Sequence, residues 1–335
     1  MPDSRPKKIV YLFGAGATHA ELANLEKDPA SEKFLKNKGL LITHVSDRVI
    51  EQARSNKKYI KDIEMVSSAQ GSPNIELLIS LIENSRVKYS EYKTSHIKEL
   101  VRKDIEGKLT KAKKEKFYLH KALLEFHEHE KIKESEQLLG LISLNYDSVL
   151  DEAYKVIYKK SPNYSFSLNE SRSTPYPLLK LHGSFNWRRK KIRGRIRNIQ
   201  IIPLGVNKNY LHVPYNYIWN RALEILTECD ILRVVGSKLS PNDIHLVDLL
   251  FKAHLEKGEA FEIQVIASKT TGEDVRDAYG FFPKIKNLAE IEPPLVPEDN
   301  PSNAFKMWLE YKGRQLSVKE RKKTKYLKKV TGLTI

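Results

Sequence analysis

Five short apolar runs alternate with helix-like segments along this chain, and the alternation limits its fold more than any other feature of the sequence. The runs lack the polar residue at every second position that marks a half-exposed strand, so we expect both faces of each strand to be buried. Buried strands separated by helices form a parallel sheet with helices on both faces. The predicted strands are KIVYLF at 8–13, GLISLNY at 140–146, PLLKLHG at 177–183, DILRVVGS at 230–237 and FEIQVIAS at 261–268.

The fold class that follows is α/β, with a doubly wound, parallel, Rossmann-like sheet. Helices are predicted from Thr18 onward and over 73–83, where four isoleucine and leucine side chains share one face: Ile75, Leu78, Ile79 and Ile82. Residues 85–138 are rich in Lys and Glu with helical spacing and predict a helical insertion, and 185–203 predict a basic hairpin. We expect one large domain over 1–300 and a helical, basic C-terminal extension over 301–335.

The formal net charge of +16 is concentrated in two segments. Residues 188–197 contribute +7 and residues 312–329 contribute +8, so the rest of the chain is nearly neutral. The sequence therefore predicts two basic appendages on a neutral body. They suit contact with nucleic acid or with an acidic surface in an assembly or partner, but a solvated hairpin tip and tail would have the same composition.

Cysteine and hydropathy narrow the class of protein. Cys229 is the single cysteine, which excludes an intramolecular disulfide and a four-cysteine zinc site, and we expect no metal. The first residues carry no secretory apolar run, and no stretch approaches the 18 apolar residues of a membrane span, so a cytoplasmic protein is expected. Three histidines in a charged region are predicted to lie on a solvated helix face, because their spacing does not suit zinc: His120, His127 and His129.

Four of the predicted strands end in polar or glycine-rich stretches. They are GAGAT at 14–18, NYD at 145–147, HGS at 182–184 and GSKLSPND at 236–243. Ligands bind at the carboxyl ends of parallel strands, so these four ends predict one site. Each stretch alone has a structural alternative: Thr18, Asn145 or Asp147 can cap a helix, and His182 can be a packing histidine.

Five segments, in their order along the chain, resemble the sirtuin-like NADase family and its bacterial anti-phage branch. They are FGAGAT, PNIELLISLIE, SLNYDSVLDEAY, LLKLHGSFNW and VVGSKLSPNDIHLVDLLF, within residues 8–268. The resemblance implies a doubly wound sheet that binds NAD+ as its substrate. It also implies cleavage to nicotinamide and ADP-ribose, which depletes NAD+ in an infected cell.

The resemblance also implies roles for individual residues. Asn145 and His182 match catalytic residues, and Asp147 matches the aspartate that contacts the nicotinamide carboxamide. The implied cofactor-binding residues are Gly14, Ala15, Gly16 and Thr18 at the pyrophosphate, and Gly236 and Ser237 on the adenosine side. The chain departs from the family where Thr18 replaces a common serine and where Lys238 follows the last loop.

The residue types suit this chemistry independently of the resemblance. Nicotinamide leaves as a neutral ring from a cationic one, so the enzyme needs no strong acid and must instead hold the ribose and deliver water. A carboxylate can accept the carboxamide N–H, an amide can position water, and a histidine can accept a proton.

Three other functions remain open. A protein deacylase of this family uses a four-cysteine zinc module, which this chain lacks; an ADP-ribosyltransferase and a non-catalytic NAD or ADP-ribose-binding module are the others. A dehydrogenase is disfavoured, because His19 stands where a dinucleotide fingerprint has its third glycine. The resemblance further implies an off state controlled by homo-oligomerisation or by a separate partner such as a HerA-type ATPase.

Overall fold

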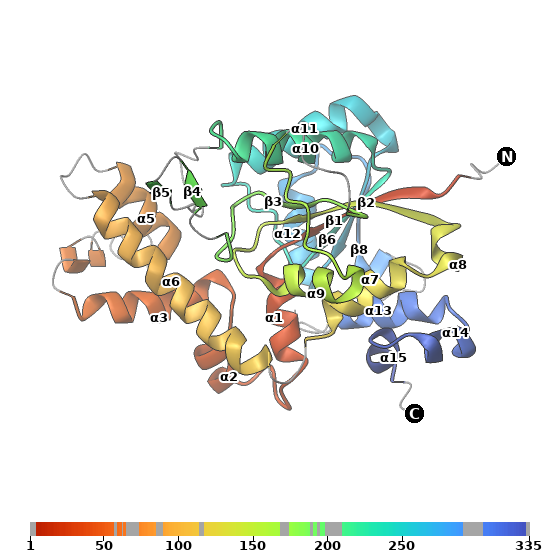
Figure 1. The fold of residues 1–335 in the computed structure, drawn as a ribbon, viewed down its shortest axis with the longest axis horizontal. Coiled ribbons are helices and arrows are strands. Elements are labelled where there is room, and N and C mark those ends of the chain that lie inside the picture. The colour runs from red at the N-terminus through yellow and green to blue at the C-terminus, as the bar shows by residue number, and fades with distance from the viewer. Residues whose placement is uncertain are drawn as a thin grey trace.

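The structure is a computed structural model (Figure 1). It describes residues 5–56, 59–61, 63–64, 74–84, 90–113, 117–167, 174–187, 190–192, 195–197, 210–290 and 304–332.

A six-stranded sheet forms the centre of the molecule, and every neighbouring pair in it is parallel. Its strands, in spatial order, are β3 (Leu178–Lys180), β2 (Glu136–Ser143), β1 (Lys7–Phe13), β6 (Ile231–Val235), β7 (Glu262–Ile266) and β8 (Ile285–Asn287). The chain builds outward from β1 to β3 and then returns to add β6 beside β1. The strand order therefore reverses between β1 and β6, and such a switch point opens a crevice at the carboxyl ends of the strands.

Helices cover both faces of the sheet, which confirms the predicted α/β, doubly wound class (Figure 1). One apolar cluster joins the sheet to α10 (Tyr215–Glu228), α11 (Ile244–Lys257) and α12 (Lys269–Ala278). A second cluster joins the other face to α1 (Ala15–Ala23), α7 (Leu119–His127), α9 (Val149–Tyr158) and α13 (Ala304–Arg314). Trp187 and Trp219 belong to the first cluster, as core residues.

A helical lobe stands to one side of the sheet, at the left of Figure 1. It contains α2 (Glu32–Lys38), α3 (Ile42–Arg54), α5 (Ile75–Asn84) and α6 (Ser90–Lys113). The four residues predicted to share a helix face all lie in the core of this lobe. Phe185, from the loop after β3, packs against the same core and connects the lobe to the carboxyl end of the sheet.

The segment 85–138 folds differently from a uniform insertion. After α6, the helix α7 lies on the sheet rather than in the lobe, and α8 (Glu130–Lys133) leads into β2, which begins at Glu136. The prediction that 261–268 is the last strand is also wrong, because β8 follows it at the sheet edge. Residues 85–89 and 114–116 lie outside the described residues, and the division into domains stays a prediction.

The predicted solvated helix face is wrong for two of the three histidines. His120 and His127 of α7 are buried, and each has a polar partner inside the protein. The His120 Nδ1 atom lies 2.8 Å from a carboxylate oxygen of Glu21, and the His127 Nε2 atom lies 2.8 Å from the hydroxyl of Tyr11. The many Lys and Glu residues near them in the sequence led to the prediction of a solvated helix, although α7 has an apolar face.

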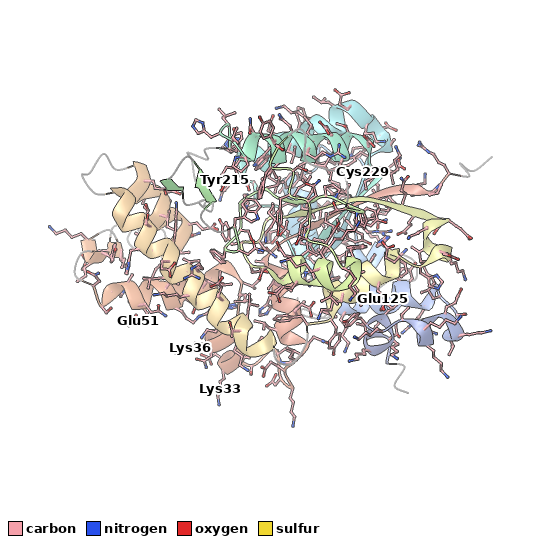
Figure 2. The ribbon with its side chains drawn as sticks, viewed as in Figure 1. Lys33, Lys36, Glu51, Glu125, Tyr215 and Cys229 are labelled. Carbon is pink, nitrogen blue, oxygen red and sulfur yellow. The ribbon has the colours of Figure 1, made fainter. Side chains whose placement is uncertain are left out.

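The basic segment 312–329 is packed against the body and is not an appendage. Trp308 and Leu309 of α13 are buried on the sheet, and Lys312 is buried with its ammonium 2.7 Å from Glu136. Two short helices follow, α14 (Val318–Lys323) and α15 (Leu327–Val330). The carboxylate of Glu125, labelled in Figure 2, accepts three backbone N–H bonds from residues 325–327 and fastens α15 to α7. A count of charges could not show the apolar residues Leu316, Leu327 and Val330, which bury this segment.

The other basic segment is described in part, and the hairpin over 185–203 stays a prediction. Strands β4 (Lys190–Ile192) and β5 (Arg195–Arg197) pair in antiparallel register. Residues 188–189, 193–194 and 198–209, which include much of the expected return arm, lie outside the described residues. In the parts of the chain that the structure describes, no helix has the length and apolarity that crossing a bilayer requires.

Candidate functional site

The ends of β1 and β6 meet at the switch point through glycines. The N–H of Gly14 donates to the carbonyl of Val235 at 2.9 Å, and the N–H of Gly16 donates to that of Gly236 at 2.8 Å. A Cβ atom on Gly14 would lie 2.5 Å from the Cβ of Ser237, and one on Gly236, whose φ is +60°, would lie 2.2 Å from a backbone nitrogen. Only glycine permits this approach. The amides of both loop glycines are thus used within the protein.

Helix α1 begins at Ala15, three residues before the predicted start, so Thr18 lies in its first turn and is not its N-cap. Gly14 is the N-cap and supplies no side-chain hydrogen bond. Ala15 is exposed. The partly positive N-terminus of α1 is therefore exposed at Ala15, on the carboxyl edge of the sheet, where an anion such as a phosphate would be stabilised.

Asn145 joins the end of β2 to this first loop. Its Nδ2 atom donates to the carbonyl of Gly14 at 2.8 Å and to the hydroxyl of Thr18 at 3.1 Å. That hydroxyl in turn donates to the Asp147 carboxylate at 2.9 Å. The structure therefore brings together three predicted site residues in one chain of hydrogen bonds. Both contacts of Asn145 use its nitrogen, so a ligand would meet this side chain through the amide oxygen.

Asp147 also contacts the start of the next helix, although the N-cap of α9 is Ser148. Its second carboxylate oxygen accepts the N–H of Val149 at 2.9 Å, at the start of α9. The bond from Val149 fixes one oxygen of Asp147, and Thr18 fixes the other. The carboxylate is therefore held in one orientation beside Asn145, as a positioned acceptor must be.

His182 follows β3 and is buried between two acceptors. Its Nε2 atom lies 2.8 Å from the Asp243 carboxylate, and its Nδ1 atom lies 3.2 Å from the carbonyl of Leu144, the residue before Asn145. A neutral imidazole has one N–H, so it satisfies one of these acceptors. The shorter contact, to a carboxylate, favours the proton on Nε2, and a second proton, on Nδ1, would be donated to the carbonyl of Leu144. That nitrogen faces the strand end that carries Asn145.

Asp243 is a site residue that the sequence analysis missed. It is the N-cap of α11, with one carboxylate oxygen 3.4 Å from the N–H of Leu246 and the other on His182. Its position directly before the apolar run of α11 signals a cap, but nothing in the sequence indicates its pairing with His182. A carboxylate that orients a histidine ring is a common support for a general base.

Lys180 is a second residue that the sequence analysis missed, and it lies beneath the loop that carries Asp147. It is buried in β3, and its ammonium pairs with Asp151 at 2.9 Å and also donates to the backbone carbonyl of Asp147. Burial opposes ionisation of Asp151, but the Lys180 ammonium keeps the pKa of that carboxyl below its usual value. The pair ties β3 to the loop that carries Asp147. A charged residue in the apolar stretch LLKLHG was the signal available in the sequence.

The loop predicted for the adenosine side lies across the switch point from Ala15. The hydroxyl of Ser237 accepts the N–H of Leu239 at 3.1 Å, and the exposed Lys238 pairs with Asp274 of α12 at 3.1 Å. A hollow of about 380 Å³ opens beside this pair, between the loop and α12. The ligand contacts of Gly236 and Ser237 stay predictions. Within the described ranges, no group of three or more His, Cys, Asp and Glu side chains is arranged to hold a metal ion.

No known protein-family profile matches the chain, and no curated protein matches it. Among solved structures, a Sir2 enzyme studied for its mechanism and regulation aligns over 93% of this chain and 94% of its own, with 14% identity and a TM-score of 0.34. A Sir2 homologue mutant in complex with ADP-ribose aligns over 83% of this chain and 94% of its own, with 16% identity and a TM-score of 0.31. A Sir2 homologue in complex with NAD aligns over 83% and 91%, with 15% identity and a TM-score of 0.32. Similarity at these scores assigns no role to any residue of this chain.

Proposed function

We propose that this protein hydrolyses NAD+ at the bond between nicotinamide and ribose, giving nicotinamide and ADP-ribose. The observation that carries the proposal is the hydrogen-bonded chain from Asn145 through Thr18 to Asp147 at the switch point, with the His182 ring next to the same strand end. An amide, a carboxylate and a histidine then surround one crevice, and a helix N-terminus opens into it. These are the groups that the reaction requires.

Each group has a defined task in the proposed reaction. The carboxylate of Asp147 accepts the carboxamide N–H and holds the nicotinamide ring, and the amide oxygen of Asn145 orients a ribose hydroxyl or the attacking water. As the bond between C1′ and the ring nitrogen breaks, its electron pair neutralises the cationic ring. Water adds to C1′ and gives its proton to the imidazole of His182, while Asp243 stabilises the resulting imidazolium.

The remaining binding roles are proposed from the same geometry. The pyrophosphate lies at the N-terminus of α1, near Ala15 and Gly16, and the adenosine lies on the side of Gly236 and Ser237. Water is the acceptor because the deacylase alternative requires a zinc module that one cysteine cannot form. No metal takes part in the proposed reaction.

The sequence resemblance supports a wider proposal for the role in the cell. We infer an anti-phage defence effector that depletes NAD+ when it is activated. Its off state would be released by a separate partner, such as a HerA-type ATPase, or by self-assembly. Contact of the basic hairpin with nucleic acid is a further possibility for the trigger, and its charge is the feature that supports it.

The test follows nicotinamide and ADP-ribose released from NAD+ by the purified protein, with and without a HerA-type ATPase. We expect equal amounts of both products without any acylated peptide. Asn145→Ala and His182→Ala should each lower turnover at least about tenfold while the protein stays folded, since a positioned base contributes about 100-fold or more. The exposed Asn220→Ala and His212→Ala are matched controls and should keep full turnover.

Three outcomes would replace this proposal. Turnover that requires an acyl-lysine peptide would show a deacylase, and ADP-ribose found attached to protein would show a transferase. NAD+ binding without turnover under every condition would favour the non-catalytic module. Full turnover in a folded His182→Ala variant would remove His182 from the mechanism.

A further inference from the structure

Exposed apolar side chains gather around one helix, α11. Among the described residues, nine large apolar side chains are exposed, and six of them lie on α11 or directly beside it. Their exposed fractions run from 41% to 76%. They are Leu211, Val213, Ile244, Phe251, Leu255 and Phe281.

Ring contacts join residues at both ends of α11 to this helix. The rings of Phe251 on α11 and Phe281 lie 5.6 Å apart. At the start of the helix, the His245 ring lies 4.0 Å from that of Tyr210, which places Leu211 next to this end of α11. A shallow groove of about 550 Å³ runs between α10 and α11 and reaches Leu255. Contiguous apolar surface of this kind marks an interaction site.

Helix α11 is apolar on two opposite sides. Its inner side packs into the core through four buried residues, Leu246, Leu249, Leu250 and Ala253. Its outer side carries Ile244, Asp248, Phe251 and Leu255, at steps of four, three and four residues. This spacing is that of the seam by which two helices pack in a coiled coil. The core explains the inner side but leaves the outer side without a function.

We propose that the outer stripe of α11 binds the same stripe of a second copy of this chain, with the two helices antiparallel. Asp248 and Lys252 select this partner and this direction. In the single chain they pair with each other at 2.7 Å, and more than half of each side chain is exposed. Antiparallel helices with Ile244 opposite Leu255 of the second copy place Asp248 beside Lys252 of that copy. Parallel helices would place equal charges together, which is unfavourable.

Local charge also favours a second copy. The whole chain carries +16, so most of its surface repels another copy. Helix α11, in contrast, has two acidic and two basic residues between Ile244 and Lys257 and is neutral. An apolar, neutral and self-complementary stripe on a basic protein suits an isologous twofold contact. One helix with its flanking side chains is a small interface, so we expect a dissociation constant of about 1–100 µM.

This inference does not depend on NAD+ cleavage, and its test measures mass. Sedimentation equilibrium of the full chain over a concentration series should show a monomer of 38.7 kDa in equilibrium with a species of twice that mass. Leu255→Lys should raise the dissociation constant at least about tenfold, because it introduces a charge into the seam. Val318→Lys is the matched control, because Val318 is also an exposed aliphatic residue but lies on α14, away from the proposed contact. It should leave the dissociation constant unchanged.

A charge exchange tests the direction and the partner together. Asp248→Lys and Lys252→Asp should each weaken the dimer, because like charges then meet across the twofold axis. An equimolar mixture of the two variants should dimerise at least about tenfold more tightly than either alone, since each pair is then of opposite sign. A wild-type chain that stays monomeric at about 200 µM would overturn the proposal. So would an unchanged mass in Leu255→Lys, or a mixture no tighter than the single variants.

Discussion

At the carboxyl edge of the sheet, Thr18, Asn145 and Asp147 are joined by one hydrogen bond at each step, and Asn145 is only partly buried. The polar cluster under α13 is built differently. There, Arg233 is buried and makes two bonds of 2.6 and 2.7 Å to the carboxylate of Glu136, whose side chain is 11% exposed. The first arrangement is a chain of single hydrogen bonds in which Asn145 is the partly exposed member, and the second is an ion pair held by two hydrogen bonds.

Glu136 and Arg233 each have further partners in the cluster under α13. The ammonium of Lys312 lies 2.7 Å from Glu136, and the Arg233 guanidinium also donates to the hydroxyl of Tyr11 and lies 5.2 Å from the Trp308 ring. Burial opposes ionisation of Glu136, but Arg233 and Lys312 keep the pKa of its carboxyl far below the usual value. Charges that are buried, paired and hydrogen-bonded stabilise one arrangement of the chain. This cluster fastens the C-terminal helices to the sheet.

The two regions should therefore respond differently to the loss of one group. Removing a member of the closed ion pair leaves its partner charged and buried, so the loss appears in the free energy of unfolding. The members of the site at the carboxyl edge are joined by single hydrogen bonds, and the change tested there keeps the helix-capping contact, so we expect the loss to appear in turnover. The following changes test this separation.

Arg233→Met should give the largest effect, a loss of about 3–5 kcal/mol in the free energy of unfolding. Methionine fills most of the volume but leaves the carboxylate of Glu136 with Lys312 alone. Urea unfolding measures the loss. NAD+ turnover per folded molecule should stay within about twofold of the wild type.

Arg221→Met is the control for this change, because Arg221 pairs with Glu224 at 2.6 Å on the exposed side of α10. An exposed pair contributes about 0–1 kcal/mol, so this variant should unfold close to the wild type. If Arg233→Met and Arg221→Met lost the same small amount, the cluster under α13 would not be the fastening that its geometry indicates.

The sequence predicted the crevice better than the ion-pair cluster, for a physical reason. Strand ends of a parallel sheet converge on one edge, so Asn145, Asp147 and the loop at Gly14 could be placed together from periodicity alone. The pairing of Arg233 with Glu136 joins strands 97 residues apart in the chain, and Lys312 joins them from 176 residues beyond Glu136. Neither strand pattern nor charge counting specifies such partners.

The same limit applies within the site. The sequence marked His182 by its position after a strand, but the partner of its ring, Asp243, lies 61 residues away in a helix cap. The Lys and Glu residues around α7 predict a solvated helix face for its histidines. In the structure these histidines are buried, and they contact Tyr11 of β1 and Glu21 of α1. Local pattern predicts which face of an element is apolar, and long-range pairing decides which polar groups are buried with it.

His127→Gln tests the buried cluster through the pH dependence of the free energy of unfolding. Burial lowers the pKa of His127 from 6.5 to about 3, and Arg233 and Lys312 oppose its protonation while Glu136 favours it. As the pH falls through 6.5, the unfolded chain takes up a proton that the folded chain refuses, so stability falls with pH. Between about pH 7 and pH 5 this histidine should account for a loss of about 2 kcal/mol.

Glutamine keeps an amide near the Nε2 position, next to the hydroxyl of Tyr11, but does not titrate. Urea midpoints at the two pH values should therefore show a smaller loss in His127→Gln than in the wild type. His19, whose pKa burial lowers to about 4, contributes equally to both proteins and cancels in the difference. Equal losses in the two proteins would mean that His127 is not held neutral by this cluster.

Asp243→Asn should change the free energy of unfolding least of these variants. Its main effect should be on the rate of NAD+ turnover. Asparagine caps a helix as well as aspartate, so α11 should keep its N-cap and the free energy of unfolding should change by less than about 1 kcal/mol. It is neutral, however, and so cannot stabilise the His182 imidazolium that forms as water gives up its proton. We expect kcat for NAD+ to fall about tenfold, which corresponds to about 1.4 kcal/mol, with KM little changed. The pH dependence of kcat should shift as well, because Asp243 acts through the ring of His182 as a positioning residue.

Asp28→Asn, at an exposed site before α2, is the control and should change none of these quantities. If Asp243→Asn kept wild-type kcat and pH profile, Asp243 would be a helix cap that happens to contact His182, and the crevice would need another partner for its base.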